Sequence, residues 1–286
     1  MKAYKKDEPM AHHTTFKIGG AAGIFLVPTN EAELARSLEQ YPSALILGGG
    51  SNLLVSDVGV EAVISTDGFK SISAEAGPDG TLLVTAGAGH SFTALSKYAH
   101  KNSLAGLEFA FGIPGSVGGA VIMNAGAFGG EVKNCLQSAR LFVDGKSETF
   151  DADKLCLSYR ASALPKGAVV LSATFGLKTG DADEIHTRMT ESLSERKLKQ
   201  PLEFPSAGSV FKNPPGMFAG KIIEGLGLKG LRAGGAQISE KHANFIVNLG
   251  GATAAQVLEL ISKVEDAAWG VGIKLEREIK LAGSFN

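Results

Sequence analysis

The spacing of apolar residues predicts several amphipathic helices. In one segment Phe92, Leu95 and Tyr98 recur at helical intervals behind Ser91, a residue type that caps helices. Two other segments open with the spacing of a capping box, in which a polar N-cap residue is followed three positions later by Glu or Gln. The capping pairs are Asn30 with Glu33, and Thr253 with Gln256. The predicted helices are Glu31–Gln40, the residues from Ser91 to about Lys101, Ala182–Lys199, Phe218–Leu226 and Ala254–Trp269.

Short apolar runs between glycines and prolines predict strands along the whole chain. Asp144-Gly145 between two such runs is a hairpin signal. The last run alternates strictly, with Ile273, Leu275, Ile279 and Leu281 on one face. The predicted strands are Gly23–Val27, Ala44–Leu47, Leu53–Val55, Val60–Ile64, Leu82–Ala86, Ala139–Val143, Lys146–Phe150, Val169–Leu177, Ser209–Lys212, Phe245–Leu249 and Ile273–Leu281. Strands interleaved with helices in this order predict an α+β protein of two or three domains.

The most unusual stretch is Gly112–Glu131, in which seven of twenty residues are glycine. Glycine permits close approach of the backbone, and successive N–H groups form a nest that binds anions. Asn124, between apolar and small residues, is expected to bond to backbone or ligand. A plain connection between strands would have the same composition. Ligand binding is favoured by a second stretch of this kind, Gly48–Asn52, directly after a predicted strand.

The Gly48–Asn52 stretch matches neither common nucleotide motif. A Rossmann fingerprint needs G-x-G-x-x-G at the start of a helix, whereas a strand is predicted to follow here. A Walker A loop needs Gly-Lys-Ser/Thr, which is absent from the stretch. A nucleotide held by this segment would therefore bind to the backbone of a turn.

Composition and charge narrow the class of protein. The chain of 286 residues is 44% hydrophobic and 20% charged, as in ordinary globular proteins. Its net charge of −1 gives no electrostatic reason to expect nucleic acid or a membrane surface as partner. No run approaches the ~18 apolar residues of a membrane span, and the basic start lacks the apolar segment of a signal peptide. Cys135 and Cys156 form no metal or disulfide pattern, so we expect no metal and a reducing cytoplasm.

The remaining polar residues do not form a hydrolase motif. There is no GxSxG elbow and no HExxH pair. Arg160, Ser209, Asn213 and Glu278 lie in segments punctuated by glycine or proline, or near them. Taken singly, Arg160 is better explained as an ordinary surface arginine, Ser209 as a turn residue and Glu278 as a solvated strand residue. Together with the glycine loops they favour a protein that holds a large phosphate-bearing cofactor, which then supplies the chemistry.

Seven motifs in order carry a much sharper resemblance. They are TTFKIGG, LGGGSNLLVSD, GIPGSVGGAVIMNAGAFGGE, SYRASAL, KQPLEFPSAGSVFKNP, GAQISEKHANFIVN and LEREIKLAG. From Thr14 to Gly283 the chain resembles the UDP-N-acetylenolpyruvoylglucosamine reductases, flavoenzymes of bacterial peptidoglycan precursor synthesis. The segment 169–199 lacks the inserted tyrosine loop of the longer family form, and Arg277 stands where the family usually has proline.

The resemblance implies a fold and a cofactor. The fold is a two-lobed FAD-binding domain of the vanillyl-alcohol-oxidase type, with lobes at 1–66 and 67–179, and a C-terminal α+β substrate-binding domain at 180–286 whose last strand returns toward the active site. FAD is expected to bind non-covalently along the glycine loops. The expected cofactor residues are Gly48, Gly49, Gly50, Ser51, Asn52, Gly112, Ile113, Pro114, Gly115, Ser116, Gly118, Gly119 and Asn124.

The resemblance also implies a reaction: NADPH reduces FAD, and reduced FAD then reduces an enolpyruvyl ether to a lactyl ether. Arg160 matches the arginine on the substrate carboxylate, and Glu278 the carboxyl group at the same centre. Ser209 matches the donor of the proton to carbon. Lys199, Asn213 and Gln237 are weaker candidates for contacts to the uridine diphosphate, and Lys199 is equally well a helix-end cation.

Other functions stay open beside this one. Another FAD-dependent oxidoreductase of the same fold class would share the glycine loops but would not need the motifs around Ser209 and Glu278. A flavin- or nucleotide-binding module without catalysis would bind the cofactor and show no reduction by NADPH. A purely structural protein is disfavoured because glycine-rich loops weaken a scaffold. No obligate protein partner is expected.

Overall fold

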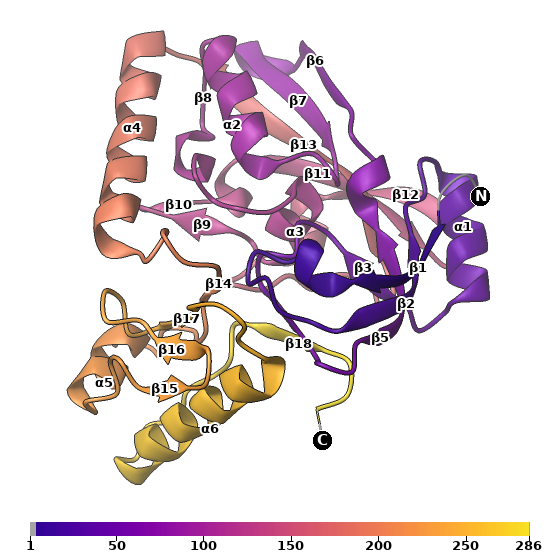
Figure 1. Ribbon diagram of the computed structural model, residues 1–286. Helices are drawn as coiled ribbons and strands as arrows, with labels where there is room; N and C mark the ends of the chain where they lie inside the picture. Colours follow the sequence, from indigo (N-terminus) through magenta and orange to yellow (C-terminus); the bar gives the residue numbers. More distant parts are fainter. Residues whose placement is uncertain (1–3, 286) are drawn as a thin grey trace. The chain divides into compact units, whose positions relative to one another are not determined.

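A computed structural model describes residues 4–285 of the chain, which form two units (Figure 1). Unit 1 contains Leu26–Gly49 and Val63–Arg196. Unit 2 contains Lys5–Phe25, Gly50–Ala62 and the residues from Lys197 onward. Each unit is therefore assembled from separate stretches of chain. No helix among the described residues is long and apolar enough to cross a bilayer.

Unit 1 is built on an antiparallel sheet with the strand order β12-β11-β13-β7-β6, in which β8 also pairs with β13. The central strand alternates, with Leu171, Ala173 and Phe175 buried, so one face of the sheet carries the core. Its strands are β6 (Ile72–Ala76), β7 (Thr81–Gly87), β8 (Leu104–Ala105), β11 (Leu136–Val143), β12 (Lys146–Asp151) and β13 (Val169–Thr179).

Helices α2 (Phe92–Lys101) and α3 (Val117–Ile122) supply the other half of this core. Phe92 and Leu95 on α2 are buried in one cluster with Val117 and the sheet residue Phe175. Unit 1 also holds α1 (Glu31–Gln40), the parallel pairing of β3 (Leu45–Leu47) with the second half of β5 (Val60–Ser65), and the small hairpin β9 (Gly126–Ala127) with β10 (Gly130–Glu131).

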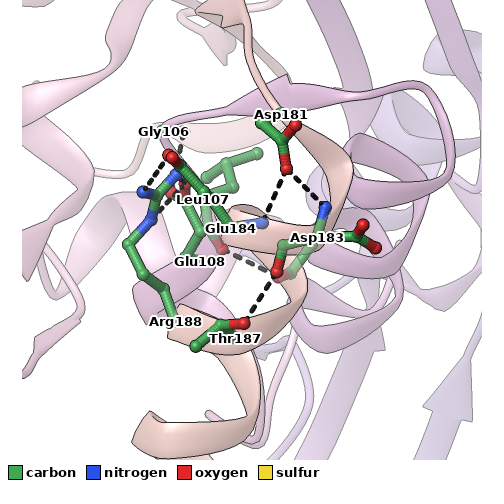
Figure 2. Close-up of polar contacts among 9 residues, drawn as sticks. Gly106, Leu107, Glu108, Asp181, Asp183, Glu184, Thr187 and Arg188 are labelled. Atoms are coloured by element: carbon green, nitrogen blue, oxygen red, sulfur yellow. Dashed lines mark hydrogen bonds and ion pairs between the residues drawn. The ribbon is translucent and has the colours of Figure 1, made fainter.

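Helix α4 (Ala182–Lys199) is fixed in unit 1 near its start (Figure 2). A carboxylate oxygen of Asp181 accepts hydrogen bonds from the backbone N–H groups of Asp183 and Glu184, at 2.9 and 3.0 Å. One turn further on, the Arg188 guanidinium donates to Glu108, whose other carboxylate oxygen accepts from the N–H of Gly106. The cap and the ion pair together fix the first two turns of α4 to unit 1.

Unit 2 contains an antiparallel sheet of order β14-β17-β16-β15, against which α6 (Ala254–Gly270) packs (Figure 1). Its strands are β14 (Ser206–Ser209), β15 (Arg232–Ala233), β16 (Ala236–Ile238) and β17 (Phe245–Asn248). Unit 2 also holds α5 (Ala219–Gly225), the neighbouring strands β1 (Tyr4–Pro9) and β2 (Ala21–Leu26) with the first half of β5, and the parallel pair β4 (Leu53–Val55) and β18 (Lys280–Ala282).

The caps predicted from sequence are confirmed. Thr253 and Gln256 form both bonds of a capping box at the start of α6, and Ser91 Oγ accepts from the N–H of Ala94. Asn30 accepts from the N–H of Glu33. The second bond of a capping box is absent here, because the carboxylate of Glu33 accepts from Thr29 and not from the N–H of Asn30.

Two predicted strands near the end of the chain are wrong. Of the predicted strand 273–281, only the last residues join β18, and 273–279 is irregular apart from one bridge between Arg277 and Phe211. The alternation is real at Leu275 and Ile279, which are buried, but Leu281 is 37% exposed. The predicted strand 209–212 is displaced to 206–209, because Ser206 and Ser209 pair with β17. The strands not predicted are β1, β6, β8, β9, β10, β15 and β16, and helix α3 was not predicted either.

Candidate active site

The two glycine-rich loops meet in unit 1. The first follows β3 and the second precedes α3. A Cβ atom on Gly49 would lie 2.5 Å from Cα of Gly115, and one on Gly48 would lie 2.5 Å from Oγ of Ser116. Real Cβ atoms do not come this close to backbone, so the contact between the loops requires glycine. Ser116 also caps α3 by accepting from the N–H of Gly119 at 3.4 Å.

A cavity of about 250 Å³ lies where these loops meet. Its wall combines backbone with hydroxyl groups and carries an ion pair between Lys70 and Asp67. Such a wall can hold the phosphate groups of a nucleotide by N–H groups, hydroxyls and one cation. The lining residues are Gly48, Gly49, Thr66, Asp67, Lys70, Gly89, Ser91, Gly115 and Ser116.

The sequence interpretation missed the part of this wall that follows β5, although the sequence predicted the two strands that lead to it. Strands β3 and β5 are parallel neighbours, so their carboxyl ends lie at the same edge of the sheet. Gly48 follows β3 and Thr66 follows β5 directly, which makes the residues after both strands neighbours. The sequence predicted both strands, but it did not show that they pair.

The other expected cofactor residues are distributed over both units. Gly112, Ile113, Pro114, Gly118 and Gly119 lie in unit 1, whereas Gly50, Ser51 and Asn52 lie in unit 2. Several of these glycines are required by packing inside the protein. A Cβ on Gly50 would lie 2.0 Å from the carbonyl oxygen of His13, and one on Gly118 would touch Ala88. A high frequency of glycine in a segment therefore indicates close packing within the protein as well as a backbone that a ligand can approach.

Asn124 is fully buried in a left-handed conformation with φ +40°. Its Nδ2 donates to Glu131 at 2.8 Å and to the carbonyl of Ser158 at 3.0 Å, and its Oδ1 accepts from the N–H of Lys133 at 2.9 Å. The side chain thus bonds to protein groups, as the sequence interpretation allowed.

Arg160 sits in a tight turn of unit 1. Ser158 and Ala161 exchange two backbone hydrogen bonds across it, and Arg160 has a φ of +54°. Its Nη2 donates to the carbonyl of Gly126 at 2.8 Å, and its guanidinium lies 5.3 Å from the ring centre of Tyr159. The bond to Gly126 directs the guanidinium along the β9–β10 hairpin.

A second arginine of unit 1, Arg196, was missed by the sequence interpretation. A basic residue near the end of α4 is expected to be an exposed cation. In the structure, only 7% of Arg196 is exposed. Its guanidinium lies 5.6 Å from the ring centre of Phe128 at the tip of the β9–β10 hairpin. Burial first, and then the charge of Arg160, lower the pKa of Arg196 below its ordinary value. The hairpin therefore contacts two guanidinium groups.

Ser209 and Glu278 lie on neighbouring segments of unit 2, and both are partly exposed. Ser209 ends β14, and the carbonyl of the next residue, Val210, accepts from the N–H of Glu278 at 2.8 Å. Asn52 holds the same segment, because its Nδ2 donates to the carbonyl of Glu278 at 3.0 Å. The structure thus brings the predicted proton donor and the predicted carboxyl group together within one unit, while Arg160 belongs to unit 1.

The residues expected near the diphosphate, Lys199, Asn213 and Gln237, also lie in unit 2. Lys199 is exposed at the end of α4. Asn213 Oδ1 accepts from the first N–H of α5, that of Ala219, at 3.0 Å. Gln237 is buried in β16, and its Nε2 donates to the carbonyl of Gly230 at 3.1 Å. Asn213 and Gln237 thus have structural partners.

Comparison with known proteins agrees with this arrangement. Residues 22–152 match the model of an FAD-binding domain, and residues 200–282 match the C-terminal domain of UDP-N-acetylenolpyruvoylglucosamine reductase. These two matches define a flavoprotein of the oxidoreductase class. The chain belongs to the family of the UDP-N-acetylenolpyruvoylglucosamine reductases.

Relatives support this assignment over nearly the full length. The chain is 47% identical to the UDP-N-acetylenolpyruvoylglucosamine reductase of Agathobacter rectalis, covering 98% of this chain and 94% of that one. It is 45% identical to that of Lachnoclostridium phytofermentans, covering 97% and 92%. The crystal structure of the Thermus caldophilus reductase superposes with a TM-score of 0.85 at 39% identity, covering 98% of both chains.

Proposed function

We propose that the protein reduces UDP-N-acetylglucosamine enolpyruvate to UDP-N-acetylmuramate, with NADPH as reductant and non-covalent FAD as carrier, in the cytoplasm. The observation that carries the proposal is the match to both domain models together with 47% identity across 98% of the chain. The match over 200–282 disfavours another flavin oxidase, since that region is specific to the family. Both cysteines are free thiols, which suits a reducing compartment.

The cavity between the glycine loops fits the phosphates of FAD. Gly48 and Gly115 offer backbone without side chains, and Ser91 and Ser116 offer hydroxyls, while the charge of Lys70 is paired with that of Asp67. The chemistry that bound FAD would supply here is hydride transfer, from NADPH and then to the methylene carbon of the enolpyruvyl double bond. We further propose that 1–66 and 67–179 serve as the FAD-binding lobes and 180–286 as the substrate-binding domain.

The residues of this chain then have distinct tasks. Arg160 binds the substrate carboxylate with its guanidinium and stabilises the negative charge that develops there. Glu278, in its protonated form, donates a hydrogen bond to the same centre. Ser209 Oγ gives its proton to the carbon next to the carboxylate, which balances the hydride added to the methylene carbon. Lys199, Asn213 and Gln237 contact the uridine diphosphate.

An anaerobic spectral titration tests the proposal. The purified protein, loaded with FAD, is expected to show a yellow flavin band that bleaches with NADPH and returns with UDP-N-acetylglucosamine enolpyruvate. A protein that cannot be loaded with FAD would contradict the proposal altogether. Bleaching without recovery on adding the sugar nucleotide would indicate another flavin oxidoreductase, and flavin binding without bleaching would indicate a binding module.

A further inference from the structure

We propose that Asn124 is a positioning residue for Arg160, and that the segment from Asn124 to Glu131 sets the direction of the Arg160 guanidinium. The proposal rests on the function proposed above for Arg160. It assigns Asn124 a task in the substrate half of the reaction, in place of a contact to the cofactor. All the groups involved lie in unit 1.

The first support is the pair of bonds that join the two segments. Asn124 Nδ2 donates to the carbonyl of Ser158 at 3.0 Å, and Arg160 Nη2 donates to the carbonyl of Gly126 at 2.8 Å. The first bond holds the backbone of the turn, and the second holds the end of its side chain. The backbone of the turn and the guanidinium of Arg160 are thus both bonded to the short segment 124–126.

The second support is that Asn124 itself is held rigidly. It has no exposed surface, its Nδ2 also donates to Glu131, and its Oδ1 accepts from the N–H of Lys133. The adjoining hairpin is closely packed, because a Cβ on Gly126 would lie 2.6 Å from the Glu131 Cβ, and one on Gly130 would lie 2.6 Å from the Phe109 ring. A rigid support is what a group needs to stay within the small tolerance of a productive geometry.

The third support is the backbone conformation of the turn. Arg160 has a φ of +54°, which is uncommon and strained for a residue with a long side chain. The carbonyl of Ser158 accepts from both Ala161 and Asn124, so the bond from Asn124 helps to hold this conformation. Without it, the turn can relax and the guanidinium moves.

The test measures the two half-reactions separately in two variants. Asn124→Gly removes the side chain, and glycine adopts a positive φ without strain. Asn124→Asp keeps the size and replaces the amide donor with a carboxyl group that faces the Glu131 carboxylate. We expect flavin content and flavin reduction by NADPH to stay near those of the wild type. Reoxidation by the enolpyruvyl substrate is expected to slow about tenfold to a hundredfold, as for a misplaced group. Asn134→Ala is the matched control, since Asn134 bonds to the N–H of Glu131 in the same hairpin but does not bond to Ser158.

A double-mutant cycle shows whether Asn124 acts through Arg160. In an Arg160→Lys background, Asn124→Gly is expected to slow reoxidation by less than twofold further. Additive losses, equal losses in both half-reactions, or loss of flavin from both Asn124 variants would overturn the positioning role. If Arg160→Lys alone leaves reoxidation unchanged, the role proposed for Arg160 fails instead, which distinguishes the two failures.

Discussion

At the scale of single residues, Ser209 and Glu278 differ in how the chain holds them. Ser209 belongs to a strand that pairs with β17. Glu278 belongs to an irregular segment fixed by a few backbone bonds, including those to Val210 and Asn52. The N–H of Lys212 donates to the carbonyl of Glu276, and the N–H of Glu278 donates to the carbonyl of Val210. The N–H of Arg277 takes part in neither bond, and the side chain of Arg277 donates to Glu265.

We expect Ser209→Ala to separate the two half-reactions. Removing the hydroxyl removes the proton donor but leaves the cofactor cavity unchanged, because that cavity is lined by other residues. Stopped-flow absorbance should show near-normal bleaching by NADPH and a reoxidation by substrate that is slower by a factor of about 100 or more. A similar loss in both steps would contradict the role of proton donor.

Glu278→Gln and Glu278→Ala test the protonation state of the carboxyl group. A protonated carboxyl and a carboxamide can both donate a hydrogen bond, whereas alanine cannot. We therefore expect the rate of flavin reoxidation to fall less in Glu278→Gln than in Glu278→Ala. If the glutamine variant is the slower one, a charged carboxylate must be the working form.

At the scale of elements, the contact between the two glycine loops determines the cavity. In Gly49→Ala the new Cβ would lie 2.5 Å from Gly115 Cα and 2.9 Å from the N of Ser116, so one loop must move. We expect a lower flavin content after purification and a lower melting temperature. Gly270→Ala is the control, because no atom lies within 4 Å of its Cβ and alanine in a helix stabilises by about 0.5–1 kcal/mol.

The start of α6 depends on a residue far away in sequence. The two carboxylate oxygens of Asp57 accept from the N–H groups of Ala254 and Ala255, at 2.7 and 2.9 Å. Since a lost helix cap costs about 1 kcal/mol, we expect Asp57→Ala to lower the melting temperature by about 2–4 °C. The exposed carboxylate of Glu61, changed to alanine, serves as a control in the same calorimetric scan.

What the sequence can predict at this scale follows from how local the signal is. The helices with caps in their own sequence, such as α1 and α6, are predicted nearly to the residue. Strand pairing is not local, so neither the neighbourhood of β3 and β5 nor the irregular run before β18 could be foreseen. At the site, the motifs indicated Ser209 and Arg160, whereas Lys70 and Arg196 lie in segments whose composition is that of ordinary surface.

At the scale of the whole molecule, we expect the free energy of unfolding to depend on pH through the protonation of His242. Burial lowers its pKa below 6.5, the effect of Lys229 adds to this, and the ring Nδ1 accepts from the N–H of Asn244 at 3.2 Å. Below pH ~6.5 the unfolded chain binds a proton at this site more readily than the folded one, so stability is lost as the pH falls. Urea unfolding at pH 7.5 and 5.5 should show a smaller drop for His242→Gln than for the wild type. An equal drop would exclude this histidine as a source.

The composition of unit 2 from three separate stretches has a consequence for synthesis. Strand β4 is made long before its parallel partner β18, residues 280–282. Until β18 has left the ribosome, the backbone groups of Leu53–Val55 lack that partner. Unit 2 is therefore completed late in synthesis, and a stop codon before residue 280 would remove the strand that pairs with β4.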